Sequence, residues 1–296
     1  MNTNTQLRNF ILETDWGWDC DDAVAIRLLS NAHKKQEINL AGINVNSSFP
    51  NSIAALDIFL RHNDISGEIP LGLDIFSDDF EKSPGYHSYI VCNGNIQRQN
   101  RDALPPFSFY RHLLPAFDDN SCQILSIGFT QCLAALLGDP EMKELICKKV
   151  SHLWVMGGKW DEEGGKEYNF SRMPPISSAA SKLCSDWPTP VTLLGFEVGQ
   201  SVLTGRHLPD NDLLKGIMRV HGSPNGRCSW DPMLALLALE GSPEKAGYSS
   251  IYGKAAVRKE DGANFFTPDI HGPHRYVVKT RPDSYYEEAI DSRIDP

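Results

Sequence analysis

The chain has 296 residues, with 28 Lys and Arg against 38 Asp and Glu, which gives a net charge of -10. This balance disfavours a nucleic-acid backbone or an anionic membrane as the main partner, because both attract basic faces. It fits a small neutral ligand, or a cation held by carboxylates. Hydrophobic residues make up 41% and charged residues 22%, so the chain can bury an ordinary core and wholesale disorder is excluded.

The seven cysteines are an odd number and include no C-x-x-C pair. This argues against a zinc ribbon or a thioredoxin-type site and favours free thiols in a reducing compartment. Residues 1–9 lack the basic start and apolar run of a signal peptide, and no apolar stretch approaches the ~18 residues of a membrane span. We therefore expect a soluble, cytoplasmic protein.

Strand-like and helix-like segments alternate along the first part of the chain. The apolar run Asn9–Thr14 predicts a buried strand, and Ala23–Leu29 has apolar residues at helical spacing. Three further segments continue this alternation, namely a strand at Asn39–Val45, an amphipathic helix at Ser52–Arg61 and a short strand at Ile69–Leu73. Asp78–Pro106 is polar, aromatic and rich in turn residues, so we expect a long loop that borders the substrate pocket and orders on binding.

The alternation continues to the C-terminus. The predicted elements are a strand at Cys122–Ile127, a helix at Gln131–Leu137, a strand at Val150–Met156, a helix at Ser177–Cys184, a strand at Pro190–Leu194 and a helix at Met233–Leu239. Tyr252–Val278, with its Asp261-Gly262 turn, is typical of a β-hairpin. We predict one α/β domain over residues 1–296: a Rossmann-like, mostly parallel but mixed sheet flanked by helices, with a C-terminal β-hairpin.

Ligands of such sheets bind beyond the carboxyl ends of the strands. Acidic and amide side chains follow several predicted strands or precede a late helix, namely Asp15, Asp19, Asp21, Asp22, Asn46, Glu167, Asn169, Glu197 and Asp231. We therefore expect an acidic crater at this edge of the sheet.

Four carboxylates fall within residues 15–22, of sequence DWGWDCDD. Unpaired carboxylates this close raise one another's pKa values, and solvent or a hard cation relieves the repulsion. All-oxygen ligands suit calcium or magnesium, although the spacing does not match an EF-hand loop. The alternative is a helix N-terminus at which Asp21 and Asp22 simply favour the helix dipole.

Thr14-Asp15, Gly17 and Asp21-Asp22-Ala23 resemble the opening signature of the inosine–uridine-preferring nucleoside hydrolases, in a divergent D-x-G-x-D-x-D-D form with two extra residues. Five later segments resemble motifs of that family in the same order, namely Asn44-Val-Asn46, Ser126 to Ala134, Val155-Met-Gly-Gly158, Glu167-Tyr-Asn-Phe170 and Ser229-Trp-Asp-Pro232. The resemblance spans residues 11 to about 235 and implies a single nucleoside-hydrolase-like domain.

The resemblance implies calcium-dependent hydrolysis of the N-glycosidic bond of a ribonucleoside to ribose and free base, in purine or pyrimidine salvage, by a homodimer or homotetramer. It makes Asp15 the general base and a calcium ligand. Further calcium ligands would be Asp22, Asp231 and the backbone carbonyl of Gln131, or of Thr130 with a different gap. Substrate contacts would come from Asp21, Asn46, Glu167, Asn169 and, by stacking, Trp230.

The chain departs from the family at Trp230, where a histidine associated with protonating the leaving base is expected. His87 and His221 are candidates for this acid, the alternative being that each is a surface histidine. Trp16, Trp18 and Trp160 either stack on a nucleobase or belong to the core, and Asp161 is the nearest candidate for a 5′-hydroxyl contact.

Several of these assignments have simpler alternatives. Asn46 suits a turn, and Glu167 with Asn169 suits a solvated loop. Asp19, the inserted acid, either supports the site or is exposed. Two other functions compete with hydrolysis of a nucleoside: a non-catalytic calcium- or ribose-binding protein, and a haloacid-dehalogenase-type phosphohydrolase. The second fits poorly, because Glu13 stands where its D-x-D motif needs an aspartate.

Overall fold

A computed structural model describes residues 7–65, 69–74 and 84–295. Its main feature is a nine-stranded sheet of order β10-β9-β11-β6-β5-β4-β1-β2-β3. The strands are β1 Arg8–Thr14, β2 Ile38–Val45, β3 Leu71–Leu73, β4 Cys122–Ser126, β5 Val150–Met156, β6 Val191–Leu194, β9 Tyr248–Val257, β10 Asn264–Pro268 and β11 His274–Lys279. Neighbouring strands from β11 to β3 run parallel, whereas β9 is antiparallel to both β10 and β11. A separate two-stranded sheet pairs β7 Leu203–Thr204 with β8 Arg227–Cys228.

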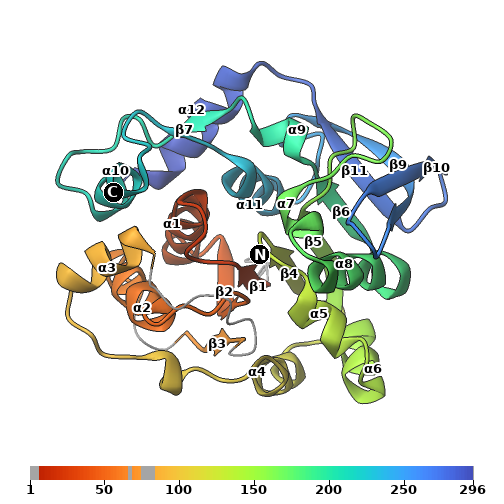
Figure 1. Cartoon of the computed structure of the whole chain (residues 1–296), viewed down its shortest axis with the longest axis horizontal. Helices are drawn as coiled ribbons and strands as arrows, with labels where there is room; N and C mark the ends of the chain where they lie inside the picture. The colour runs from red at the N-terminus through yellow and green to blue at the C-terminus, as the bar shows by residue number, and fades with distance from the viewer. Residues whose placement is uncertain (1–6, 66–68, 75–83, 296) are drawn as a thin grey trace, which may run out of the picture.

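Helices cover both faces of the sheet (Figure 1). One layer contains α1 Asp21–Lys34, α2 Ser52–His62, α3 Gly85–Cys92, α10 Leu213–His221, α11 Trp230–Glu240 and α12 Asp283–Ile294. The other contains α4 Pro106–Leu113, α5 Gln131–Leu136, α6 Pro140–Lys149 and α8 Pro174–Asp186. Within the described residues, none of these helices is both long and apolar enough to cross a membrane.

The two cores follow from the alternation of side chains along each strand. Phe10 and Leu12 of β1 pack in the core under α1 and α11, and Ile11 packs in the core under α4 and α5. The central strands are apolar on both faces, as a parallel sheet between two helical layers requires. The predicted α/β sheet with flanking helices is therefore confirmed.

The prediction of one long loop over Asp78–Pro106 is wrong where a helix and a 3₁₀ turn interrupt its described part. Residues 75–83 lie outside the described residues. Helix α3 begins at Gly85, a 3₁₀ turn spans Asn100–Asp102, and Pro106 opens α4. Tyr86, one of the aromatic side chains that suggested a flap, is instead buried in the core, as is Ile90 of the same helix. Helix α3 is stabilised by this packing rather than by an amphipathic pattern that the sequence displays.

The predicted C-terminal hairpin is confirmed and extended by a third strand. β9 and β10 pair around a turn that contains Gly262, and β11 then inserts between β9 and β6. The helices α6, α10 and α12 were not predicted. Each of these helices is short or is followed by polar residues. Which of their side chains are buried becomes clear only when they pack in the helical layers.

Candidate active site

The β1–α1 loop brings its acidic residues back over the end of the sheet because two glycines allow a close approach. Gly17 has φ +126°, and a Cβ at this position would lie 2.6 Å from the Phe49 ring. At Gly128, beyond β4, a Cβ would lie 2.4 Å from the Asp15 backbone nitrogen. A side chain at either glycine would therefore displace Asp15 or its loop.

A cavity of about 310 Å³ opens beyond the carboxyl ends of β1, β4 and β5. Its lining residues are Asp15, Trp18, Asp19, Asp21, Asp22, Ile127, Met156, Glu167, Tyr168, Asn169, Phe196, Arg227, Trp230 and Asp231. We call it the acidic pocket. Seven of the sequence-predicted site residues meet here, namely Asp15, Asp21, Asp22, Glu167, Asn169, Trp230 and Asp231. They come from loops and helix N-termini that are far apart in the chain.

Three aspartates form the most concentrated group in the acidic pocket. Carboxylate oxygens of Asp21, Asp22 and Asp231 all lie within 4.8 Å of one another, and all three side chains are buried. Asp21 and Asp22 lie in the first turn of α1, and Asp231 lies in the first turn of α11. The backbone N–H of Asp231 donates to Asp21 Oδ2 at 3.2 Å. Two helix N-termini thus direct three carboxylates at one point.

Burial, and then repulsion from the neighbouring acids, raises the pKa values of Asp21, Asp22 and Asp231 well above those of ordinary aspartates. Thr14 donates one hydrogen bond to Asp22, which offsets only part of this effect. Buried carboxylates at this spacing suit a hard divalent cation, because oxygen ligands and negative charge are what calcium or magnesium requires. The three aspartates could therefore hold such an ion.

Asp15 lies beside this group and is itself buried. Burial, together with the charges of Asp19 and Glu167, raises its pKa to about 8. A cation at the three aspartates would lower this pKa toward neutral pH, where a carboxylate is an effective general base. Asp15 is therefore equipped to take a proton from a water molecule in the acidic pocket.

Glu167 and Asn169 are held firmly, not in a solvated loop. Glu167 caps the short helix α7 (Tyr168–Ser171): its Oε1 accepts from the Asn169 backbone N–H at 2.7 Å, and its Oε2 accepts from Gly158 N–H at 3.0 Å. Asn169 Nδ2 donates to the Met156 carbonyl at 3.2 Å. Burial raises the pKa of Glu167 to about 7. Both side chains therefore present fixed polar atoms to a ligand.

The structure places Asn46 and Gln131 outside the acidic pocket. Asn46 Nδ2 is buried and donates to Glu13 Oε2 at 3.2 Å and to the Phe129 carbonyl at 2.8 Å. The Gln131 side chain donates to the Asn46 carbonyl and lines a different cavity, of about 620 Å³. Glu13 itself lies on the α4 side of the sheet, where Tyr110 donates to it at 2.5 Å. Glu13 therefore does not stand beside Asp15 in the pocket, as the nucleophile pair of a D-x-D phosphohydrolase would require.

Neither candidate histidine lines the acidic pocket. His87 is fully buried between Trp16 and Tyr86, and burial lowers its pKa to about 3. His221 ends α10, with its Nε2 3.6 Å from Asp19 Oδ1 and its Nδ1 3.3 Å from Ser223 Oγ. His87 is thus a neutral core residue, and His221 reaches the pocket only through Asp19.

The tryptophans divide between core and pocket. Trp16 is fully buried against Phe59, with ring centroids 5.6 Å apart, and Trp160 stacks on Tyr276 at 6.1 Å. Trp18 and Trp230 line the acidic pocket. Asp161 is exposed and pairs with Lys159 at 2.7 Å, away from the pocket.

Sequence reasoning missed two residues on the Trp230 side of the pocket. Phe196 stacks on Trp230 with ring centroids 5.3 Å apart, and the Arg227 guanidinium lies 5.4 Å from the centre of the same ring. Phe196 follows β6 directly, so its place at a strand end was a usable signal. Arg227 lies two residues before the Ser229-Trp-Asp-Pro232 motif, which was a usable signal, but its contact with the pocket is seen only in the tertiary structure.

No protein-family model matches this chain, and no curated protein matches it. Solved structures do. The effector protein XOO4466 is 11% identical, with a TM-score of 0.71 over 98% of this chain and 93% of that one. The type III effector protein XopQ, in its complex with adenosine diphosphate ribose, is 11% identical, with a TM-score of 0.70 over 98% and 94%. The chain therefore has the α/β fold of these effector proteins along almost its whole length.

Proposed function

We propose that this protein binds a ribonucleoside or a related N-riboside in the acidic pocket and hydrolyses its N-glycosidic bond, with a calcium ion held by Asp21, Asp22 and Asp231. The observation that carries the proposal is the meeting of these three buried carboxylates with Asp15, Glu167 and Asn169 in one cavity. The resemblance to the nucleoside hydrolases names Asp22 and Asp231 as calcium ligands too, but gives Asp15 as a further ligand and Asp21 as a ribose contact.

The reaction develops positive charge on the sugar as the bond to the base lengthens. Carboxylates fixed around the ribose stabilise that charge. Asp15 takes the proton of the attacking water, and Glu167 and Asn169 hold ribose hydroxyls through atoms fixed by backbone hydrogen bonds. When bound, a calcium ion would offset the carboxylate charge and orient ribose hydroxyls and water.

A second function, ribose-ligand binding without cleavage, has one observation in its favour. XopQ, whose structure resembles this one, was solved with adenosine diphosphate ribose. That ligand contains a ribose, the group proposed here to occupy the acidic pocket. Its binding here would need the carboxylate cluster and the ribose-holding residues but not Asp15 as a base.

The test is release of reducing sugar from purine and pyrimidine ribonucleosides and from adenosine diphosphate ribose, with calcium and with a strong chelator. We expect wild-type cleavage of at least one compound, and its loss with chelator. Asp15→Asn should lower kcat by about 100-fold or more, because it removes the base, while the affinity for a ribose analogue changes little.

Glu141→Gln is the matched control, because Glu141 is an exposed carboxylate far from the pocket. Binding of adenosine diphosphate ribose without cleavage of any compound would favour the second function. Wild-type turnover by Asp15→Asn would contradict the assignment of the base.

A further inference from the structure

Cleavage of an N-glycosidic bond requires stabilisation of the charge that develops on both the sugar and the base. The sugar gains positive charge, and the departing base gains the electron pair of the broken bond. The carboxylates of the acidic pocket suit the sugar but oppose negative charge on the base. Among the described residues that line the pocket, Arg227 is the one with a permanent positive charge.

Arg227 is oriented by two contacts. Its Nε lies 2.9 Å from Asp19 Oδ1 and 3.1 Å from Oδ2, and its Nη2 also donates to Asp19. Its guanidinium lies 5.4 Å from the centre of the Trp230 ring. The remaining nitrogen, Nη1, has no hydrogen-bond partner among the described residues. A fork with two bonds to one carboxylate leaves its third nitrogen available to a ligand.

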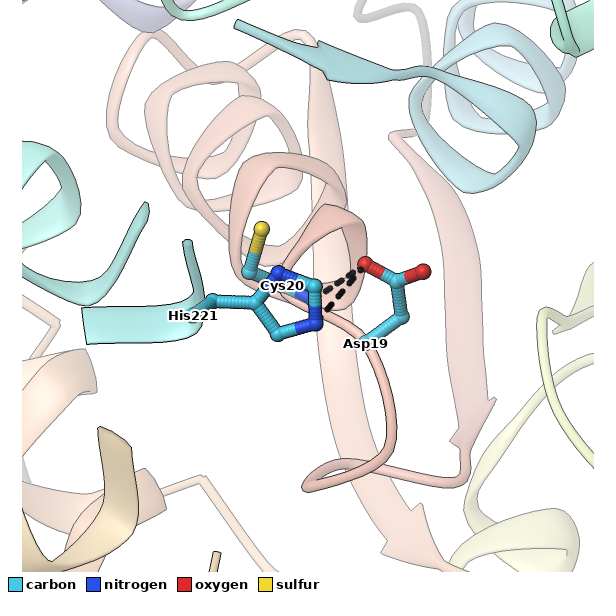
Figure 2. Close-up of side chains that lie close together, drawn as sticks. All are labelled: Asp19, Cys20 and His221. Atoms are coloured by element: carbon cyan, nitrogen blue, oxygen red, sulfur yellow. Dashed lines mark hydrogen bonds and ion pairs between the residues drawn. The ribbon is translucent and has the colours of Figure 1, made fainter. Parts of the chain in front are cut away.

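Asp19 is anchored at the start of α1, as Figure 2 shows. Its Oδ1 accepts from the Cys20 backbone N–H at 2.6 Å, and the His221 ring faces the same oxygen. Asp19, Cys20 and His221 also offer atoms within 4.8 Å of one another, which by itself would suggest a metal site. The Asp19 carboxylate already accepts hydrogen bonds from Arg227. Asp19, Cys20 and His221 therefore hold the arginine in place rather than a metal ion.

We propose that Arg227 is the leaving-group residue of the reaction, with Asp19 and the ring of Trp230 as its positioning residues. This inference rests on the proposed function. It accounts for two features that the sequence left unexplained, the inserted acid at position 19 and the tryptophan at position 230.

In the proposed step, the C1′–N bond breaks and its electron pair goes to the base nitrogen. At the same time, Arg227 Nη1–H donates a hydrogen bond to the departing base. The water oxygen bonds to C1′, and Asp15 takes the water's proton. The base gains its proton from solvent after departure, and Asp15 returns its own to solvent. No histidine is needed to protonate the base before it leaves.

The test compares two substrates of unequal leaving ability: the ribonucleoside that the wild type cleaves fastest, and p-nitrophenyl riboside, whose nitrophenolate leaves without assistance. Arg227→Gln keeps a hydrogen-bond donor but removes the charge. We expect it to lower kcat/KM for the nucleoside by about 100-fold and for p-nitrophenyl riboside by less than about 3-fold. Asp19→Asn should show the same pattern with a smaller loss. Arg219→Gln, at an exposed arginine paired with Asp210, is the matched control.

Equal losses of kcat/KM on both substrates would mean that Arg227 supports the pocket structurally. No loss of kcat/KM on either substrate would mean that Arg227 has no part in the reaction. Either result overturns the inference while the proposed function stands. If the wild type cleaves neither compound, the proposed function fails and this inference fails with it. Retained thermal unfolding temperatures in Arg227→Gln and Asp19→Asn would show that both variants are folded.

Discussion

Single residues in the acidic pocket show a conflict between stability and function. Asp21, Asp22 and Asp231 are buried together, and burial and neighbouring acids raise the pKa of each of them. No fold requires such a group for its own stability, since one aspartate at a helix N-terminus is enough to favour the dipole. A bound cation would offset the electrostatic cost of burying these three carboxylates. Functional sites commonly retain residues that lower the stability of the fold.

Asp22→Asn should therefore have opposite effects with and without calcium. Without the ion, loss of one repelling charge should raise the thermal unfolding temperature by about 2–4 °C, equivalent to about 1 kcal/mol for a chain of this size. Added calcium should raise the unfolding temperature of the wild type but not of the variant, because the ion binds only a complete ligand set. Differential scanning fluorimetry with a calcium titration measures both effects.

Glu141→Gln provides the reference for loss of an exposed carboxylate. An unfolding temperature that does not respond to calcium in the wild type would argue against a cation at the three aspartates. A fall in the unfolding temperature of Asp22→Asn without calcium would show that the cluster is not repulsive.

At the scale of elements, the loops after β2 and β4 are tied to the end of β1 by a buried polar network. Asn44 Nδ2 donates to Glu13 Oε1 at 3.0 Å, and Asn46 bridges Glu13 and the Phe129 carbonyl. Burial raises the pKa of Glu13 to about 7, and three side-chain donors oppose that rise. This network fixes the strand ends from which Asp15 extends.

Asn46→Ala should therefore act on stability more than on substrate binding. It leaves the Glu13 carboxylate and the Phe129 carbonyl each short of a buried donor, which should lower the free energy of unfolding by about 1–3 kcal/mol. Urea denaturation measures this loss, and KM for the cleaved nucleoside should change by less than about 3-fold.

Asn225→Ala, in an exposed turn, is the control for loss of an asparagine side chain. A rise in KM of more than about 10-fold without loss of stability would return Asn46 to the ribose contacts that its resemblance implied. That outcome would require a rotation of its amide away from Glu13.

At the scale of the whole molecule, several histidines are buried as neutral groups in the packed layers. His274 of β11 is 3% exposed, and its Nδ1 accepts from the Ala255 backbone N–H at 2.9 Å. Burial, with the charge of Lys254, lowers its pKa to about 4. The unfolded chain binds a proton at this histidine near pH 6.5, so it takes up more protons than the fold does at acid pH.

The stability that His274 contributes is thus present above about pH 6.5 and lost as the pH falls toward about 4. At pH 5 the loss should be about 2 kcal/mol relative to pH 7.5. His274→Asn keeps an acceptor for Ala255 but cannot titrate, so its free energy of unfolding should fall less steeply over this range. Urea denaturation at pH 7.5, 6 and 5 measures the difference between the two slopes.

His112→Asn, at an exposed position, controls for the substitution itself. Parallel slopes for wild type and His274→Asn would contradict the assignment of His274 as a buried neutral group. The comparison between variants is needed because buried carboxylates such as Glu167 titrate over the same pH range. Their protonation changes the free energy of unfolding in the opposite direction.

The sequence by itself determined the sheet and the acidic loop, because both depend on local pattern. Apolar runs bounded by turns predict buried strands, and four carboxylates in eight residues are visible in any reading of the chain. Only the tertiary structure decided which polar residues face the pocket. Asn46 follows a strand as Asp15 does, yet its side-chain amide donates to the buried Glu13 carboxylate and Phe129 carbonyl. Arg227 lies close to the Ser229-Trp-Asp-Pro232 motif, but its orientation follows from a contact with Asp19, 208 residues distant along the chain. A side chain's role at this site depends on its direction and its partners, which long-range packing sets and local sequence does not.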